Sequence, residues 1–336
     1  MRVAEVARAA CALLVAAWLG TVAAGDALAT IGSLLPPAVA NNFDQIIKAA
    51  AATCEALPLE LLFARSYSLE MPTTDIVEFK NSSQRKYRVT YAHEYLKQMP
   101  STLVLYVPGW WNTPTDESSN AIVDALLTKH PLVLVLDTRL SFCRGYVSSV
   151  ARVNPLANLL YSFIKKLHKG GFDVSSIHII GFSLGAHVAG MTGKLVQKRL
   201  KTKLGMITAL DPAKPCFAKT EKKLDKRDAR FVQVIHSSSG ILGLEVPLGH
   251  ADVYVNGVVG KQPECQDRSI SLSCDHAQAW KLYSASVMDD KSLMGKKCAT
   301  WEELVDHRCS GEVVALGYSC SSKSKGVFLY KSKYVE

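Results

Sequence analysis

Several features that define whole classes of protein are missing from the sequence. Beyond its first 40 residues it has no run of roughly 18 or more apolar residues, so we expect no membrane-spanning helix in the body of the chain. It has no internal repeat and no low-complexity tract, and its 48% hydrophobic and 21% charged content is typical of globular proteins. No proline- or glycine-rich linker divides the 336 residues, which favours a single domain.

Nucleic-acid-binding motifs are also missing, although the formal net charge is +9. The lysines and arginines cluster in residues 194–203, 214–230 and 323–333. We interpret these clusters as a solvated basic face and expect no nucleic acid partner. Attraction to anionic lipid or to sulfated glycan is a weaker alternative.

The first 24 residues are typical of a signal peptide. Arg2 and Arg8 give a basic start, residues 9–24 are apolar and rich in small side chains, and Val22-Ala23-Ala24 fits a cleavage site. An uncleaved anchor helix is the alternative, which the short span disfavours. The sequence therefore predicts that residues 1–24 are removed and that residues 25–336 form a secreted, extracellular chain.

The cysteines agree with an oxidising compartment. Loss of Cys11 with the signal peptide would leave eight, and an even number in a secreted chain favours disulfides. A zinc site is the alternative, but no C-x-x-C pair supports it. Asn81 opens an N-x-[ST] sequon and is therefore a candidate glycosylation site.

Short apolar runs alternate with segments of helical spacing. Buried strands are predicted at 101–107, 131–136, 176–180, 205–210 and 231–235, helices at 41–57, 120–129, 154–169 and 185–200, and a strand-like pattern runs from 61 to 89. This alternation predicts an α/β fold with a mostly parallel sheet and helices on both faces. In such sheets the chemistry gathers at the carboxyl ends of the strands.

One serine stands at such an end. Gly181-Phe-Ser183-Leu-Gly185 is a G-x-S-x-G sequence between a predicted strand and a predicted helix, which is typical of a sharp turn that exposes a nucleophilic hydroxyl. The backbone N–H of Leu184 would then face a developing oxyanion. The alternative is a turn that needs small residues only for packing. We predict that Ser183 is a nucleophile.

A nucleophilic serine needs a base and an orienting acid, which in this class of fold follow it in the order acid, then histidine. Asp211 ends the next buried strand, 28 residues after Ser183, and is the predicted acid. We predict that His276, which follows Cys274 on a loop at the start of a helix, is the base. The alternatives are His250 for the base and Asp225, Asp228 and Asp252 for the acid.

The oxyanion needs a second donor from the loop after an earlier strand. Trp110 follows the first buried strand, and Gly109 before it allows close approach, so the Trp110 N–H is the candidate. The alternative is that Trp110 and Trp111 only pack or contact lipid.

Together these motifs resemble the secreted pancreatic-lipase-like family over about residues 60 to 333. The resemblance rests on Gly181-Phe-Ser-Leu-Gly-Ala-His187, Ala209-Leu-Asp-Pro-Ala213, Leu224-Asp-x-x-Asp-Ala229, Val234-Ile-His236, Gly249-His-Ala-Asp-x-Tyr254, Gln262-Pro263 and Cys274-x-His276. It implies an α/β-hydrolase fold, a triad of Ser183, Asp211 and His276, and oxyanion donors at Trp110 and Leu184.

The resemblance also implies two disulfides, Cys265–Cys274 and Cys298–Cys309, and leaves the partners of Cys54, Cys143, Cys216 and Cys320 open. Members of the family carry a lid between the first pair, and here only residues 266–273 lie between them. Residues 237–249 form a second short loop. Both lengths resemble the secreted phospholipases A1 more than the triacylglycerol lipases, and so short a lid should leave the site open. A small lipid-contacting rim is expected from the apolar residues Ile241, Leu242, Leu244, Ile270 and Leu272, unless they pack inward.

Departures from the family pattern concern the oxyanion loop, a metal site and partners. Pro108 stands where the family has a histidine before the oxyanion glycine. Asp225 and Asp228 match half of a calcium site of some relatives, but Lys223 replaces an arginine there, so we expect no required metal and no cofactor. The chain ends soon after Cys320, so we expect no C-terminal lipid-binding β-sandwich and no colipase-type partner. We also expect a monomer.

The sequence therefore predicts a secreted lipid carboxylic ester hydrolase, a phospholipase A1, that acts on lipid at a membrane, micelle or lipoprotein surface. A triacylglycerol or neutral lipase is the alternative within the same chemistry. A non-catalytic lipid-binding or yolk-type storage protein is the alternative of another class. The presence of Ser183, Asp211 and His276 together disfavours it.

Overall fold

A computed structural model describes residues 43–57, 59–65, 71–81, 83–96, 100–258, 261–266 and 271–332. The predicted signal peptide, residues 1–24, lies outside these ranges. None of the helices within them is long and apolar enough to cross a bilayer.

A single sheet of 11 strands, in the order β10-β9-β11-β8-β7-β6-β5-β3-β4-β1-β2, runs through the described residues. The seven strands from β11 to β4 are mutually parallel, and antiparallel strands complete both edges. The strands are β1 Asp75–Lys80, β2 Ser83–Arg88, β3 Leu103–Val107, β4 Val133–Asp137, β5 Ile177–Phe182, β6 Leu204–Leu210, β7 Ala229–His236, β8 Ala251–Val255, β9 Met294–Cys298, β10 Val313–Ala315 and β11 Gly326–Tyr330.

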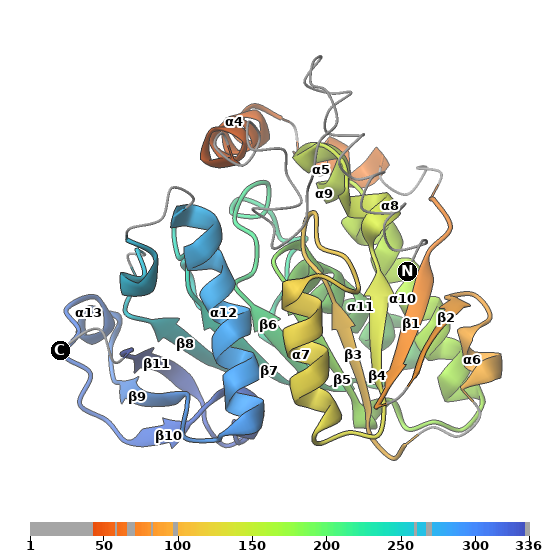
Figure 1. Cartoon of the computed structure of the whole chain (residues 1–336). Coiled ribbons are helices and arrows are strands. Elements are labelled where there is room, and N and C mark those ends of the chain that lie inside the picture. The colour runs from red at the N-terminus through yellow and green to blue at the C-terminus, as the bar shows by residue number, and fades with distance from the viewer. Residues whose placement is uncertain are drawn as a thin grey trace, which may run out of the picture.

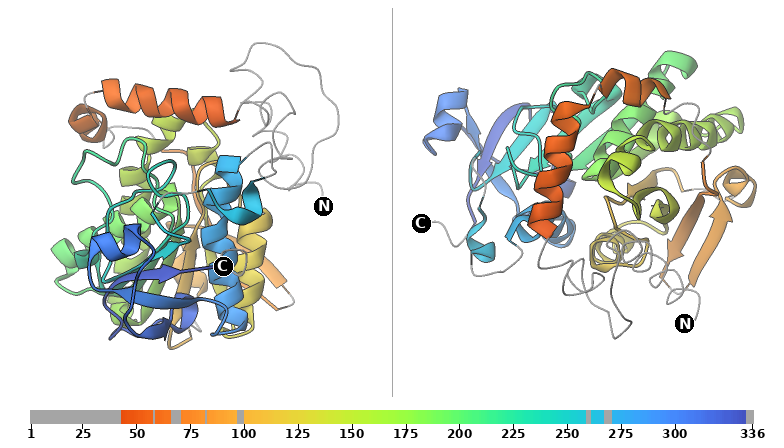
Figure 2. Two further views of the ribbon diagram at one scale, coloured as in Figure 1. Left: turned by 90° about the vertical axis from the view of Figure 1, so that its left-hand side faces the viewer. Right: turned by 90° about the horizontal axis from the view of Figure 1, so that it is seen from above.

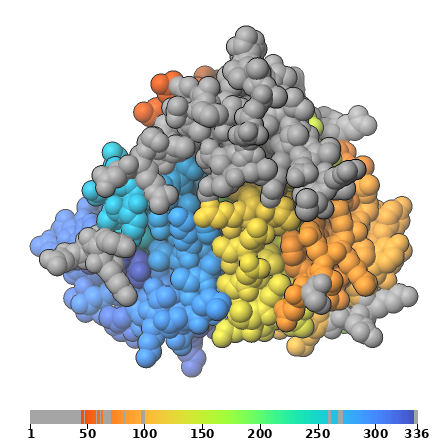
Figure 3. All heavy atoms as spheres, in the orientation of Figure 1, coloured from red at the N-terminus to blue at the C-terminus, as the bar shows by residue number. Residues whose placement is uncertain are grey.

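Helices cover both faces of this sheet, as Figure 1 shows. Alternate residues of a buried strand enter different cores, so Leu105 of β3 joins one cluster and Tyr106 the other. The first cluster packs under α10 Val153–Lys169 and α11 Leu184–Leu200, and the second under α7 Glu117–Leu127 and α12 Ser271–Met288. In Figure 3, α12 and α7 lie side by side on the surface. The predicted α/β fold with a mostly parallel sheet is confirmed.

The predicted strand-like pattern over residues 61–89 is wrong at its start. Residues 59–65 form the helix α5 Leu59–Arg65. Leu59, Leu62 and Phe63 all pack against the core at a spacing of three and four residues, which a helix allows and a strand does not. Further along the pattern, β1 and β2 pair as an antiparallel hairpin, and Asn81 after β1 is exposed.

The carboxyl ends of the parallel strands point toward the top of the molecule in Figure 1. The short helices α8 Arg139–Phe142 and α9 Tyr146–Val150 lie there, and α4 Phe43–Ala56 runs across this end, as the two views of Figure 2 show. The small helices α6 Ala92–Tyr95 and α13 Trp301–Val305 lie elsewhere, beside β2 and β9.

Disulfides join Cys54 to Cys216, Cys265 to Cys274 and Cys298 to Cys309. The first of these settles a pairing that the sequence left open, and it connects α4 to the segment that follows β6. Cys320 carries a free thiol, so the even number of cysteines does not mean that all of them pair. Such disulfides are typical of proteins of oxidising compartments.

Candidate active site

Ser183 lies in the sharp turn between β5 and α11. Its backbone has φ +55° and ψ −118°, a conformation that is strained for any residue other than glycine. The turn is held because the Ser183 N–H donates to the Leu210 carbonyl at 2.9 Å and the Ser183 carbonyl accepts from the Ala186 N–H at 3.1 Å. This geometry is that of a nucleophile elbow, in which the hydroxyl stands above the sheet edge.

The glycines on either side of Ser183 permit this turn. A Cβ on Gly181 would lie 2.5 Å from the Gly185 carbonyl, and a Cβ on Gly185 would collide with the Val107 carbonyl at the end of β3. Helix α11 therefore begins directly against the loop that carries the second predicted oxyanion donor.

The loop after β3 also touches the serine itself. A Cβ on Gly109 would lie 2.9 Å from the Ser183 Cβ. The backbones of Trp110 and Leu184 thus lie on the two segments that flank Ser183. The Trp110 side chain is fixed by stacking on Trp111 and by donating from Nε1 to the Arg144 carbonyl at 2.8 Å.

Asp211 follows β6 in a left-handed backbone conformation, with φ +44°, and its side chain is fully buried. Its Oδ1 accepts from the N–H groups of Ser237 and Ser238 at 2.9 and 3.2 Å, and its Oδ2 accepts from the Ser238 hydroxyl. Burial alone would raise the pKa of the Asp211 carboxyl, but the hydrogen bonds from His276, Ser238 and Ser237 outweigh it and hold that pKa below its usual value. Asp211 is therefore ionised at neutral pH.

His276 binds this carboxylate. Its Nδ1 lies 2.5 Å from the Asp211 Oδ2, and its ring packs 4.5 Å from the ring of Phe182. The loop position predicted for His276 is wrong, because α12 begins at Ser271 and carries His276 in its second turn. The helix begins early because Leu272, Ala279 and Tyr283 are buried at helical spacing on one side of it.

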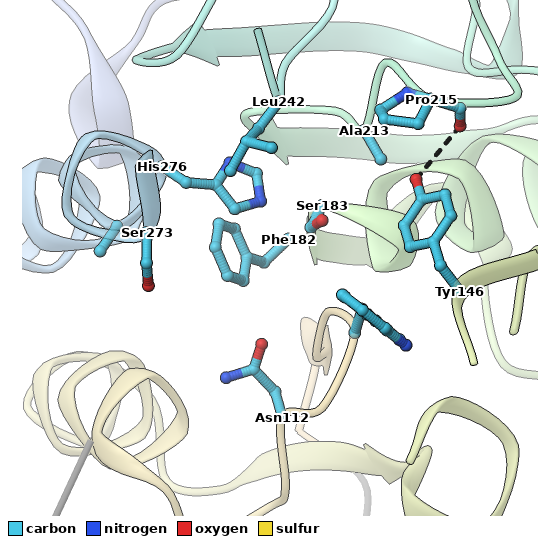
Figure 4. Close-up of a pocket in the computed structure, with 11 residues that line it drawn as sticks. Asn112, Tyr146, Phe182, Ser183, Ala213, Pro215, Leu242, Ser273 and His276 are labelled. Atoms are coloured by element: carbon cyan, nitrogen blue, oxygen red, sulfur yellow. Dashed lines mark hydrogen bonds between the residues drawn. The ribbon is translucent and has the colours of Figure 1, made fainter. Parts of the chain in front are cut away.

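Ser183 and His276 face the same cavity (Figure 4). The cavity holds about 510 Å³ of space, part of it open to solvent, and is lined by Trp110, Asn112, Tyr146, Phe182, Ser183, Ala213, Pro215, Leu242, Ser273, His276 and Ala277. Most of these side chains are apolar, which suits an acyl chain. Within the described residues no hydrogen bond joins the Ser183 hydroxyl to the imidazole, and such contacts often tighten only when substrate binds.

The alternative acid Asp252 and the alternative base His250 have other partners. His236 and Asp252 form a fully buried pair with 3.0 Å between Nε2 and Oδ1, and the Asp252 Oδ1 also accepts from the Leu248 N–H at 2.8 Å. His250 accepts from the Val232 N–H at 3.0 Å, away from the cavity. These three side chains hold loops together and do not reach Ser183.

The two aspartates of the possible calcium site are also used within the protein. Asp225 accepts from the Arg227 backbone and guanidinium, and Asp228 accepts from the Asp225 N–H at 2.8 Å. Burial raises the pKa of Asp228 to about 7. Among the residues described, no cluster of three or more His, Cys, Asp or Glu side chains is arranged to hold a metal.

Sequence reasoning missed the residues that support the acid. The Ser238 hydroxyl donates to Asp211, and Gln262 fixes the preceding serine by donating from Nε2 to the Ser237 carbonyl at 2.8 Å. Nothing distinguishes Ser238 from its neighbours Ser237 and Ser239 in the sequence. Gln262 belongs to one of the motifs behind the family resemblance, but the motif alone predicted no role for it in the site.

The expected apolar rim is mostly wrong. Leu242, Leu244 and Leu272 are buried in the main core, as the alternative of inward packing predicted, and Leu242 also lines the cavity. Ile241 alone of the described members is exposed, at 39%. Ile270 lies outside the described residues.

The geometry agrees with a comparison to known families, in which the lipase family matches residues 64–327. The chain belongs to this family. Its sheet, elbow and order of serine, aspartate and histidine are those of the α/β-hydrolase fold.

Curated relatives of this lipase-family chain include Phospholipase A1 member A of Pongo abelii, which is 39% identical over 190 residues, 55% of this chain and 41% of the relative. Lipase member H of Danio rerio is 36% identical over 195 residues, 56% of this chain and 42% of the relative. The matched region thus spans about two fifths of each relative's own length. Among solved structures, a phospholipase/carboxylesterase from Dyadobacter fermentans is 12% identical with a TM-score of 0.33, over 52% of this chain and 78% of that one.

Substitutions of Asp211 and of Asp225 should show which of the two aspartates is the catalytic acid. Asp211→Asn should lower kcat on a short soluble ester by roughly four orders of magnitude, because an amide favours the wrong imidazole tautomer. Asp225→Asn, measured without added calcium, should change kcat little, because Asp225 binds only the segment of Arg227. The reverse ranking would move the acid to the loop of Asp225.

A methyl group beside the acid should also be costly. A Cβ on Gly243 would collide with the Asp211 carboxylate, so Gly243→Ala should lower kcat about 100-fold by displacing it and the imidazole that it holds. Gly145→Ala is the matched control, because nothing lies within 4 Å of its new Cβ. Steady-state kinetics and thermal melting of both variants test this, and equal kcat in the two would contradict it.

Proposed function

We propose that this protein is a secreted lipid carboxylic ester hydrolase in which Ser183, Asp211 and His276 act as the catalytic triad. The observation that carries the proposal is the pair of the buried Asp211 and the partly buried His276, with 2.5 Å between Oδ2 and Nδ1, beside a serine in an elbow turn. Membership of the lipase family supports the reaction class.

In the proposed reaction the Ser183 Oγ attacks the acyl carbonyl while the His276 Nε2 accepts the hydroxyl proton. The imidazolium then gives this proton to the departing alcohol as the ester bond breaks. Asp211 holds the proton on Nδ1, so that Nε2 is free to act as the base. Water activated by the same imidazole releases the acid and regenerates the serine.

The N–H groups of Trp110 and Leu184 are the proposed donors to the oxyanion. Leu184 begins α11, where unpaired N–H groups and the positive end of the helix dipole favour an anion. Trp110 follows Gly109, whose missing Cβ lets this loop contact Ser183. Pro108 before it does not prevent that contact.

Phospholipid is the proposed substrate class, cleaved at the sn-1 ester. The named function of the relative Phospholipase A1 member A and the short segment between Cys265 and Cys274 support it. Triacylglycerol hydrolysis is the alternative. We further propose that residues 25–336 act as one domain, as a monomer at a lipid surface without a colipase-type partner, and that the exposed Asn81 carries a glycan.

The nucleophile is tested by a conservative substitution. Ser183→Ala should yield a folded, secreted protein whose ester hydrolysis falls by several orders of magnitude. A fluorophosphonate probe should label the wild-type protein at Ser183 and leave the variant unlabelled. Wild-type protein that resists the probe and hydrolyses no ester would favour the non-catalytic lipid-binding alternative. A Ser183→Ala variant that stays as active as the wild type would show that Ser183 is not the nucleophile.

The substrate class is tested by assaying purified protein on phosphatidylcholine and triolein in matched mixed micelles. We expect faster turnover of phosphatidylcholine, with release of the sn-1 fatty acid. A preference for triolein would assign the protein to the triacylglycerol lipases and leave the triad unaffected.

A further inference from the structure

Helix α4 lies at the carboxyl end of the sheet, the end at which Ser183 and the cavity are found. It contacts α9, whose Tyr146 lines one wall of the cavity, and α12, whose Ser273 and His276 line another. The view from above in Figure 2 shows α4 running across the carboxyl ends of the strands. The helix therefore bridges two walls of the site.

One end of α4 is firmly attached. Cys54, in its last turn, forms the disulfide with Cys216, and α5 continues this attachment through Phe63, whose ring lies 5.7 Å from the ring of Phe217. The Lys222 ammonium lies 3.3 Å from the Glu60 carboxylate beside them. The attached segment of residues 216–222 follows Ala213 and Pro215, which line the cavity.

The described side chains in the rest of α4 that face the core are few. Ile46, Ala50 and Cys54, spaced by four residues, turn toward the core. Ala50 is small and Ile46 is only half-buried, so these two described side chains bury little apolar area against the core. Gln45, Lys48, Ala49 and Ala52 on the other side are exposed.

We infer that α4 is a hinged cover of the cavity, fixed at Cys54–Cys216, whose amino-terminal part must lift before a long acyl chain can enter. This rests on the proposed function of the site. The short segment between Cys265 and Cys274 led us to expect an open site, and α4 supplies cover from the opposite end of the sequence.

The test compares probes of different length. Alkyl fluorophosphonates with an ethyl or a hexadecyl chain react with Ser183, and only the long chain needs the cover to lift. Ile46→Ser weakens the packing of α4, so it should speed labelling by the hexadecyl probe about tenfold, the effect of losing part of one buried aliphatic side chain. Labelling by the ethyl probe should stay unchanged.

Ala52→Ser on the exposed side of α4 is the matched control and should react like the wild type with both probes. A second variant, Cys54→Ser with Cys216→Ser, removes the disulfide that fixes α4 and leaves Ile46 in place. It should also speed labelling by the hexadecyl probe. Thermal melting shows that each variant is folded.

If the hexadecyl probe labels the wild type, Ile46→Ser and the double cysteine variant at equal rates, the inference that α4 is a cover is wrong. Slower hexadecyl labelling in these variants would also overturn it, because α4 would then be a binding wall for the chain. Failure of the ethyl probe to label even the wild type would instead overturn the proposed function itself.

Discussion

The hydrogen bond between Asp211 and His276 is the interaction on which the rest of the site depends. An ionised carboxylate with no exposed surface is tolerated only when every lone pair finds a donor, and Asp211 finds them in His276 and in the Ser237–Ser238 turn. That requirement fixes the path of the chain after β7 and leaves Gly243 no room for a side chain. It also sets how closely α12 approaches the end of β6.

A second constraint is the strained backbone at the ends of β5 and β6. Ser183 and Asp211 both adopt positive φ, at the ends of adjacent parallel strands. Such conformations persist only where surrounding contacts enforce them. Here the Ser183 N–H is bonded to the Leu210 carbonyl and the Asp211 N–H to the Ile235 carbonyl, so the strained residues are held by the sheet itself.

Much of this arrangement could be predicted from the sequence, because apolar periodicity reports local structure. The buried parallel strands β3 to β7 and the helices α10 and α11 match their predicted ranges closely. The periodicity failed where a short apolar run fits either period, as in α5. The periodicity also failed to predict where α12 begins. Leu272 and Tyr283 lie on the buried side of this helix, but the sequence alone does not show which of its residues are buried. The role of Ser238 and the position of α4 depend on contacts between distant segments, which no local pattern records.

The Cys54–Cys216 disulfide joins residues 162 positions apart and has a consequence for biosynthesis. At about 5 to 20 residues per second, Cys216 is synthesised roughly 8 to 32 seconds after Cys54. In that interval β1 to β6 are translated, and with them Ser183 and Asp211. Helix α4 is thus made before the strands that carry Ser183 and Asp211, and it is joined afterwards to the segment that follows β6. The native Cys54–Cys216 bond can therefore form only after β6 has been synthesised, so the Cys54 thiol is free or reversibly paired until then.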